Sequence, residues 1–326
     1  MGEPAGIGAE IALKAWLALR DTRYAFFLLH DPVAVASLAD AIGLNVPIKR
    51  IANPSEASAV FGGALPILSM TLPAPVVPGV IDARNTLTVI EAIRRAVKHT
   101  LRGEASALVT NPIQKSALYA AGFHFPGHTE FLENLAGDSF RAIMMLAAKA
   151  LKVVPVSIHE PLMSAITGLS TEKIIATVRA TARGLRRDFG LSEPRLAIAG
   201  LNPHAGENGT MGRQEIEIIA PAVETLRSEG INASGPFPAD TMFAARARRD
   251  YDAAICMYHD QALIPIKTLD MDGGVNVTLG LPFVRTSPDH GTALDIAGRG
   301  IASPGSLISA IEMAGEVAGH RMREKS

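Results

Sequence analysis

Three histidines stand at equivalent places in this 326-residue sequence, each directly after a strand-like apolar run: His159, His204 and His259. In open α/β sheets, ligands bind beyond the carboxyl ends of the strands. Three imidazoles that meet there can hold one divalent cation and leave a fourth position open for a substrate hydroxyl, as in catalytic zinc sites. A single histidine at such a place is more often a cap or a core residue, so the hypothesis depends on all three together.

Polar residues crowd the ends of the second and third runs. Side chains of this kind orient metal-bound imidazoles by hydrogen bonding to the second ring nitrogen. The pairs at 202–203 and 208–209 also indicate simple turns, and both interpretations hold at once. The residues concerned are Asn202, Glu207, Asn208, Asp260 and Gln261.

Two sets of residues have the chemistry of an anion site. The segment Gly127–Glu130 precedes a helix-like stretch, and it fits either an anion-binding helix N-terminus or an ordinary cap. Lys267, Asn276 and Arg285 lie in or beside strand-like segments late in the chain. Basic side chains there can clamp a carboxylate or phosphate, although each of them alone also fits a solvated surface position.

A glycine-rich loop, Ser287–Gly300, leads into a predicted short helix. Such loops let a backbone approach a dinucleotide closely. The G-x-G-x-x-G fingerprint is absent, because no third glycine follows Gly6 and Gly8 at the required spacing, and the P-loop pattern is absent too. A nicotinamide cofactor would therefore not use the common Rossmann loop.

Composition narrows the class of protein. The net charge is -1 and no run of Lys and Arg stands out, which argues against nucleic-acid binding. No apolar stretch reaches the roughly 18 residues of a membrane helix, and no signal peptide is recognisable. The single cysteine, Cys256, lies in an apolar run and is predicted to be a buried, inert thiol, which fits a cytoplasmic protein.

Short apolar runs alternate with longer amphipathic ones, which is typical of an α/β fold. Several runs are apolar throughout, as expected for parallel strands that are covered on both faces. The predicted strands are 24–29, 105–109, 142–147, 153–158, 195–201, 252–258 and 275–279. The predicted helices are 10–19, 86–101, 113–121, 171–188, 214–228, 241–248 and 306–323.

Six ordered motifs resemble the 4-hydroxythreonine-4-phosphate dehydrogenase family over nearly the whole chain. The stretch His290–Gly298, which overlaps the last of these motifs, is also similar to the cofactor loop of isopropylmalate and isocitrate dehydrogenases. Two features depart from the family: an apolar strand usually precedes the first motif, and many members have histidine where Gln114 stands. The motifs are Gly2–Gly8, Gly127–Phe131, Gly200–Glu207, Met257–Gln261, Gly274–Pro282 and Arg285–Thr292.

The resemblance implies two α/β/α domains with a cleft between them, as in isocitrate and isopropylmalate dehydrogenases. Residues 1–125 plus 285–326 would carry the cofactor loop, and residues 126–284 the metal site and the dimer contacts. It further implies a homodimer with the active site at its interface. The expected reaction is NAD- or NADP-dependent oxidation of 4-phosphooxy-L-threonine at C3, after which the β-keto acid loses CO2 to give 3-amino-2-oxopropyl phosphate.

The family's site residues carry over to this chain in three groups. The metal ligands, for Zn, Co or Mg, match the three histidines, although imidazoles suit Zn²⁺, Co²⁺ or Ni²⁺ better than Mg²⁺. The cofactor residues are expected within the glycine-rich loop, at His290, Gly291, Thr292 and Asp295. The substrate contacts match His128, Thr129, Lys267, Asn276 and Arg285.

The base and the exact substrate stay open at this stage. Lys267 is the candidate catalytic residue, and a histidine or a metal-bound water could serve as base instead. Related enzymes oxidise 4-phospho-threonate, 4-phospho-erythronate or a dihydrodiol carboxylate. Two other classes are a metal-dependent phosphate-ester hydrolase and a non-catalytic anion-binding module, and the dinucleotide-type loop argues against both.

Overall fold

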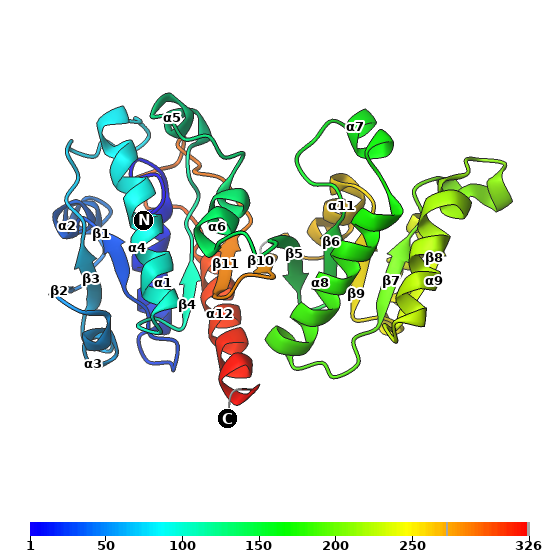
Figure 1. The fold of residues 1–326 in the computed structure, drawn as a ribbon. Helices are drawn as coiled ribbons and strands as arrows, with labels where there is room; N and C mark the ends of the chain where they lie inside the picture. Colours follow the sequence, from blue (N-terminus) through cyan, green and yellow to red (C-terminus); the bar gives the residue numbers. More distant parts are fainter. Residues whose placement is uncertain (272, 325–326) are drawn as a thin grey trace. The chain divides into compact units, whose positions relative to one another are not determined.

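The computed structural model describes residues 1–271 and 273–324 (Figure 1). Contacts divide the chain into two compact units. Unit 1 comprises Met1–Phe140 and Leu281–Ala318, and unit 2 comprises Arg141–Gly280 and Gly319–Ser326. The chain thus leaves unit 1 after Phe140 and returns to it at Leu281. The predicted domain bounds, 1–125 plus 285–326 and 126–284, stay a prediction. The functions assigned to the two domains stay predictions.

Unit 1 holds a parallel three-stranded sheet and a separate parallel strand pair. The sheet has the order β1-β3-β2, with β1 (Leu28–His30), β3 (Leu65–Ser69) and β2 (Ile48–Ile51). The pair joins β4 (Ala107–Val109) to β11 (Val284–Pro288). The helices of this part of the chain are α1 (Gly8–Leu19), α2 (Pro32–Ala41), α3 (Ala57–Phe61), α4 (Thr86–Leu101), α5 (Lys115–Ala120), α6 (His128–Ala136) and α12 (Gly305–Glu324).

One apolar cluster in unit 1 is centred on Trp16 of α1, whose side chain is fully buried. Its indole Nε1 donates a hydrogen bond to the Phe61 carbonyl at 2.8 Å, so the polar atom of this large side chain is satisfied. Leu65 and Ile67 of β3 belong to the same cluster. The cluster therefore fixes α1, and with it the turn that precedes α1, against the sheet.

Unit 2 is built on strands in the order β10-β5-β6-β9-β7-β8. The run β6-β9-β7-β8 is parallel, whereas β5 is antiparallel to both β10 and β6. The strands are β5 (Ile143–Ala148), β6 (Leu151–Pro155), β7 (Leu196–Ala199), β8 (Ala233–Phe237), β9 (Ala253–Cys256) and β10 (Val275–Leu279). The helices are α7 (Leu162–Thr167), α8 (Thr171–Phe189), α9 (Ala220–Ser228), α10 (Ala239–Met242) and α11 (His259–Leu269).

The α/β class is confirmed, and α4 and β10 have the predicted bounds. The predicted helix at 241–248 is wrong: α10 is four residues long, and a 3₁₀ turn follows at Ala247–Arg249. The arginine-rich residues after α10 offer little apolar surface for a helix face to bury. A continuous apolar run was expected to indicate a parallel strand, but β5 is antiparallel to both of its neighbours. Such a run therefore indicates that a strand is buried and does not indicate its direction.

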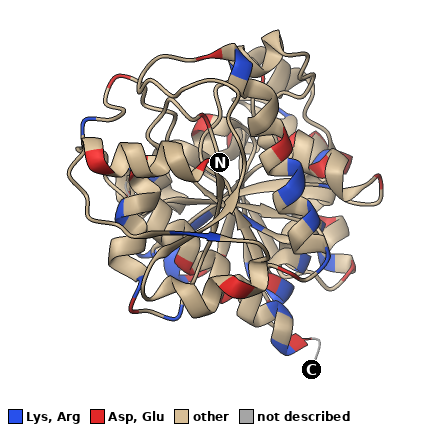
Figure 2. Ribbon diagram, turned by 90° about the vertical axis from the view of Figure 1, so that its left-hand side faces the viewer, with Lys and Arg blue, Asp and Glu red and all other residues tan. Residues whose placement is uncertain are grey.

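Figure 2 shows acidic and basic residues interspersed along the helices and loops of the ribbon. In the described part of the chain, no helix combines the length and the apolar character that crossing a bilayer requires. Cys256 is fully buried in β9, and burial raises the pKa of its thiol, as the inert-thiol prediction requires.

A buried ion cluster closes one end of α8. Asp188 is 1% exposed and accepts from the Nε atoms of Arg187 and Arg321 at 2.7 Å each. Burial raises the pKa of Asp188, but the two guanidinium groups outweigh it and hold that pKa below its usual value. The carboxylate therefore stabilises the folded chain only while it is ionised.

Replacing this carboxylate tests its contribution. Asp188→Asn leaves two guanidinium groups without a counter-charge and is expected to lower the free energy of unfolding at pH 7 by about 3 kcal/mol. Because the folded pKa lies below the unfolded value of about 3.9, the gap between wild type and variant should narrow as the pH falls below about 4. Urea unfolding at several pH values measures both effects. Exposed Asp250→Asn is the control, and a constant gap down to pH 3 would contradict the assignment.

Candidate functional site

The three histidines follow three neighbouring parallel strands of unit 2. His159 comes after β6, His259 after β9 and His204 after β7, and β9 pairs with both of the others in parallel. All three chain exits therefore lie at the same edge of the sheet. The strand-end placement predicted from the sequence is confirmed, and the role of the histidines as ligands stays a prediction.

Two of the three imidazoles come together. The ring centres of His159 and His259 are 5.8 Å apart. Two imidazoles that share one tetrahedral cation at bond lengths of about 2.1 Å have ring centres about 5 Å apart. Asp260 lies 2.7 Å from Nδ1 of His259, which commits that nitrogen and leaves Nε2 as the available ligand atom. This contact is the orienting role predicted for Asp260.

The third histidine begins an unusual loop. Residues 204–208 all have positive φ, including the non-glycine residues His204 at 52° and Glu207 at 43°. A left-handed conformation costs a non-glycine residue roughly 1–2 kcal/mol, so the surrounding structure must hold this loop in place. Strain of this kind is concentrated at functional sites.

Glu215 supplies that support. Its Oε1 accepts from the backbone N–H groups of Leu201 and Asn202 at 2.7 Å each, and its Oε2 accepts from Nδ2 of Asn202 at 2.9 Å. A Cβ on Gly206, whose φ is +80°, would lie 2.6 Å from the same carboxylate, so no other residue fits there. Burial raises the pKa of Glu215, but these hydrogen bonds outweigh burial and lower it.

Gln261 joins the exits of β7 and β9. It is 8% exposed, its Oε1 accepts from the Met257 N–H at 2.7 Å, and its Nε2 donates to the Gly200 carbonyl at 2.7 Å. Each partner lies a few residues before one of the histidines. Gln261 therefore fixes the spacing of the loops that carry His204 and His259, and it does so through the backbone rather than through an imidazole.

Within residues 1–271 and 273–324, no group of three or more His, Cys, Asp and Glu side chains is arranged to hold a metal ion. His159 and His259 converge, and His204 is exposed on its own loop. The described part of one chain thus offers two imidazoles at a separation that suits a cation.

Unit 1 gathers positive charge around α6. Arg285 of β11 is 3% exposed and donates to Oγ1 of Thr110 at 2.7 and 3.2 Å. Burial lowers the pKa of Arg285 to about 10, which still leaves it charged at pH 7. Burial, together with the nearby charges of Arg285 and Lys115, holds the pKa of His128 well below its usual range. His128 is therefore neutral, and its Nε2 is buried without a hydrogen-bond partner.

The N-terminus of α6 adds to this field. The helix begins at His128 after Gly127, and no side chain caps it, so its first N–H groups remain available to a ligand together with the positive end of the helix dipole. Thr129 lies in the same first turn, and Glu130 places one negative charge there. The arrangement favours an anion-binding site over the ordinary side-chain cap that the sequence left open.

The remaining predicted substrate contacts lie in unit 2. Asn276 is in β10, and its buried Oδ1 has no hydrogen-bond partner. Lys267 was predicted in or beside a strand, and this is wrong: it lies in the last turn of α11, two helical turns beyond His259. Helix α11 was not predicted from the sequence because it contains Pro265, and proline usually ends a helix.

The predicted cofactor residues lie in one loop of unit 1, and the short helix expected after it does not form before α12. The Thr292 carbonyl accepts from the Ile7 N–H at 3.0 Å, and Thr292 Oγ1 donates to Oε1 of Gln114 at 3.1 Å. A Cβ on Gly6 would lie 2.8 Å from the Thr292 carbonyl, so glycine is required there. His290 Nε2 is buried without a partner.

A buried ion pair on α1 holds the far end of this loop. Glu10 is fully buried, accepts from the Ala302 N–H at 2.8 Å and pairs with Nζ of Lys14 at 2.9 Å. Lys14 in turn donates to the carbonyls of Gly300 and Ala302 at 2.9 and 2.7 Å. The loop is thus fixed at both ends by the turn and helix that begin the chain.

Sequence reasoning missed most of the residues that support these sites. Thr110 and Lys115 flank a segment singled out only for Gln114, and Glu215 and Glu10 looked like ordinary helical carboxylates. The sequence carried no signal for Glu215, because the π-helical turn that begins with it is seen only in the structure. Thr110 carried a weak signal, since it directly follows a predicted strand.

Known proteins match this chain over nearly its full length. A sequence profile described as "Pyridoxal phosphate biosynthetic protein PdxA" matches residues 23–314. The 4-hydroxythreonine-4-phosphate dehydrogenase of Caulobacter vibrioides is 53% identical over 325 residues, which cover 98% of this chain and 96% of that protein.

Two solved structures extend the comparison. A 4-hydroxythreonine-4-phosphate dehydrogenase from Klebsiella pneumoniae superimposes with a TM-score of 0.86 at 37% identity, over 98% of this chain and 96% of that one. A terephthalate 1,2-cis-dihydrodiol dehydrogenase from Burkholderia xenovorans gives 0.64 at 27% identity, over 96% and 95%. The chain is thus an α/β enzyme of the dehydrogenase class. Within that class it belongs to the PdxA family of pyridoxal phosphate biosynthesis.

The support that Glu215 gives to the histidine loop can be measured. Glu215→Gln keeps the shape of the side chain but directs an amide group at N–H donors, and we expect a loss of about 2 kcal/mol in the free energy of unfolding. Limited proteolysis should also become faster within 203–212. The matched control is Glu217→Gln, two residues along and 56% exposed. Equal proteolysis rates for the two variants would show that the carboxylate does not hold the loop.

Proposed function

We propose that this chain oxidises 4-phosphooxy-L-threonine at C3 with NAD or NADP, and that the resulting β-keto acid loses CO2 to give 3-amino-2-oxopropyl phosphate. The observation that carries the proposal is the convergence of His159 and His259 beyond two neighbouring parallel strands, in a chain whose relatives bear the name of this activity. When bound, a divalent cation polarises the substrate hydroxyl and a nicotinamide accepts the hydride.

The cationic site of unit 1 supports an anionic substrate. A charged guanidinium, a helix N-terminus and a nearby ammonium concentrate positive potential around His128. Arg285 is the residue in this group suited to bidentate binding of a phosphate or carboxylate. We assign His128, Thr129 and Arg285 to substrate binding, and we add Lys115, because its charge reaches the buried ring of His128.

The position of Lys267 bears on its role. Eight residues separate it from His259 on α11 (267 − 259), which corresponds to a rise of about 12 Å. A lysine at that distance suits the far, anionic end of a small substrate better than the hydroxyl at the cation. We therefore assign Lys267, with Asn276, to neutralising and hydrogen bonding that end, and we leave the general base to a histidine or a bound water.

A second copy of the chain would complete the metal site. His159 and His259 of one chain would supply two ligands and Asp260 would orient one of them. The third ligand would be His204 of the other copy, because this residue is exposed on a preformed loop and does not group with the first two within one chain. The proposal therefore includes a homodimer whose partners share the site.

Turnover on a panel of substrates tests the reaction. Reduction of NAD or NADP is measured with 4-phosphooxy-L-threonine, 4-phospho-erythronate, 4-phospho-threonate and a dihydrodiol carboxylate, with and without added Zn²⁺, Co²⁺ or Mg²⁺. We expect the first substrate to be fastest and His204→Ala to abolish its metal-dependent oxidation. Full activity without metal would refute the metal role, and phosphate release without reduced nicotinamide would indicate a hydrolase. The likeness to the terephthalate dihydrodiol dehydrogenase is the reason to include the last substrate.

Mixing two inactive variants tests the shared site. His204→Ala and His159→Ala chains are co-folded so that they assort at random. If each site takes His204 from the opposite copy, a mixed dimer keeps one intact site, and activity should recover to about one quarter of the wild-type value. If all three ligands come from one chain, no mixed dimer has an intact site and the mixture stays inactive. Each variant co-folded with itself is the control.

A further inference from the structure

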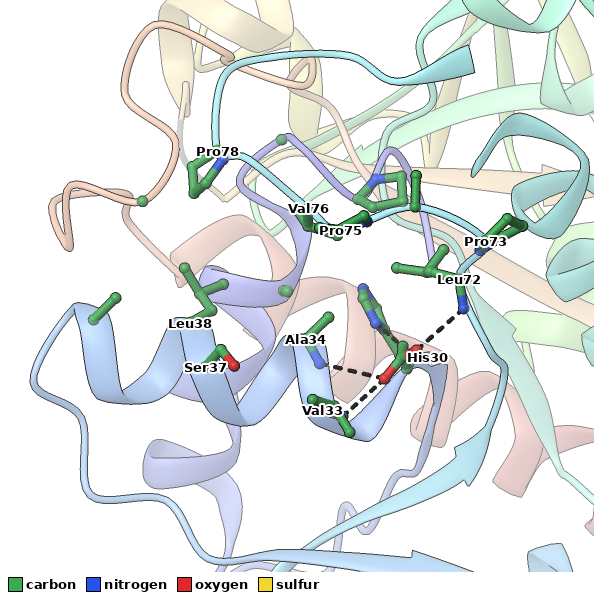
Figure 3. A pocket seen from close by; sticks show the side chains of 17 residues that line it. His30, Val33, Ala34, Ser37, Leu38, Leu72, Pro73, Pro75, Val76 and Pro78 are labelled. Atoms are coloured by element: carbon green, nitrogen blue, oxygen red, sulfur yellow. Dashed lines mark hydrogen bonds between the residues drawn. The ribbon is translucent and has the colours of Figure 1, made fainter. Parts of the chain in front are cut away.

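The two halves of the glycine-rich loop in unit 1 are held in different ways. The second half reaches a pocket of about 530 Å³ beside His30, between α2 and the proline-containing segment that follows β3 (Figure 3). The backbone packs closely there, since a Cβ on Gly298 would lie 2.6 Å from the Pro78 ring. In the first half, the hydroxyl of Thr292 donates to Oε1 of Gln114 at 3.1 Å. A side chain from another segment therefore helps to set the position of this half.

Gln114 stands at the start of α5. Its backbone is extended, and its carbonyl accepts from the Leu118 N–H at 3.2 Å, which forms the first hydrogen bond of the helix. Its side-chain amide also donates to Oγ of Ser116 at 3.1 Å. Helix α5 has six residues, too few to be stable without tertiary contacts. The position of its first turn therefore depends on contacts of this kind.

The first residue of α5, Lys115, belongs to the anion site. A Cβ on Gly127, the residue before α6, would lie 3.8 Å from Nζ of Lys115, so the ammonium group lies beside the start of α6. Its charge acts on the buried ring of His128, as the charge of Arg285 does. A shift of the first turn of α5 therefore shifts one positive charge of the anion site.

The residues just before Gln114 are held by other partners. The Thr110 N–H donates to the Thr286 carbonyl at 3.1 Å, and the Pro112 carbonyl accepts from the Glu3 N–H at 2.9 Å. These contacts fix the segment to β11 and to the turn before α1. Gln114 thus lies at the junction between a fixed segment and a short helix, and the loop contacts the chain at this junction.

We propose that Gln114 is a positioning residue that couples the glycine-rich loop to the anion site, so that a dinucleotide and an anionic substrate strengthen each other's binding. This rests on the proposed use of NAD or NADP with a phosphorylated substrate. A dinucleotide that orders the loop fixes Thr292, and through Gln114 it holds Lys115 where an anion binds. An anion bound at Lys115 favours the ordered loop by the same factor, because coupling between two sites is reciprocal.

Hydrogen exchange in the chain without ligands tests the link itself. Gln114→Leu removes both side-chain hydrogen bonds and should make amide exchange within 289–296 about fivefold faster, as the loss of one ordinary hydrogen bond predicts. Gln114→Glu keeps an acceptor for the Thr292 hydroxyl and should exchange at the wild-type rate. The matched control is Tyr119→Phe, which removes the hydrogen bond from another side chain of α5 to the Pro126 carbonyl and should leave the loop unchanged.

Cofactor binding tests the coupling. The Kd of NADH is measured by fluorescence on the full chain, without and with saturating 4-phosphooxy-L-threonine, which cannot react with the reduced cofactor. The substrate should tighten NADH at least about threefold in the wild type and in Tyr119→Phe, whereas in Gln114→Leu the ratio should fall to about one. Thr292→Val, alone or combined with Gln114→Leu, should lose the coupling to the same degree, because both changes remove the same hydrogen bond.

The outcomes separate this coupling from the proposed reaction. Unchanged loop exchange in Gln114→Leu, or a substrate effect on NADH as large as in the wild type, would overturn the role of Gln114 and leave dinucleotide use intact. Failure of the wild-type chain to bind NADH would refute the proposed function and the coupling together. Thermal melting of each variant checks the fold, and if Gln114→Leu melts early, Gln114→Asn, whose amide is one methylene shorter, replaces it.

Discussion

Main-chain polar groups at the exits of buried parallel strands need partners, and this requirement organises the histidine edge of unit 2. Where β7 and β9 end, the ladder no longer supplies those partners. Gln261 and Glu215 supply them with side-chain oxygens and one amide nitrogen. The loops that carry His204 and His259 thus receive a defined geometry from the protein itself. Buried groups of this kind are costly to leave unpaired, which explains why two polar side chains are buried at this edge.

Unit 1 meets the same requirement at its glycine-rich loop with an ion pair. Glu10 accepts from amides of the loop while Lys14 donates to carbonyls, so one pair of charges satisfies both kinds of backbone group. Three other titratable groups of this unit differ in their charge. Arg285 donates to the Thr110 hydroxyl and remains positively charged although it is buried, whereas burial holds His30 and His128 neutral.

The placement of the three histidines could be predicted from the sequence, whereas the side chains that hold their loops in position could not. Residue types and strand ends were sufficient to place three histidines at one sheet edge, because the apolar runs before them are unambiguous. Strands with an internal proline were missed, as in Leu65–Ser69 and Ala233–Phe237, since proline argues against a strand. Helix α11 was missed for the same reason, and that placed Lys267 in the wrong kind of element.

The side chains that hold the loops could not be predicted from the sequence, for a different physical reason. Glu10 and Glu215 each bond to residues brought close by the fold, and the separation from Glu10 to Ala302 is 292 positions. No local pattern records such a contact, and a buried carboxylate looks like an exposed one until its donors are known. The pocket beside His30 is equally invisible, because its walls come from four separate segments.

Unit 1 consists of two segments of the chain that are synthesised at different times, Met1–Phe140 and Leu281–Ala318. Ala107 of β4 pairs with Val284 of β11, 177 positions later (284 − 107). During synthesis, the strands of unit 2 are complete once Gly280 has been added, whereas unit 1 must wait for its last strand and for α12. Contacts over such separations form slowly, and domains fold largely in the order in which they are completed. The part of the chain synthesised first is therefore the part that reaches its final structure last.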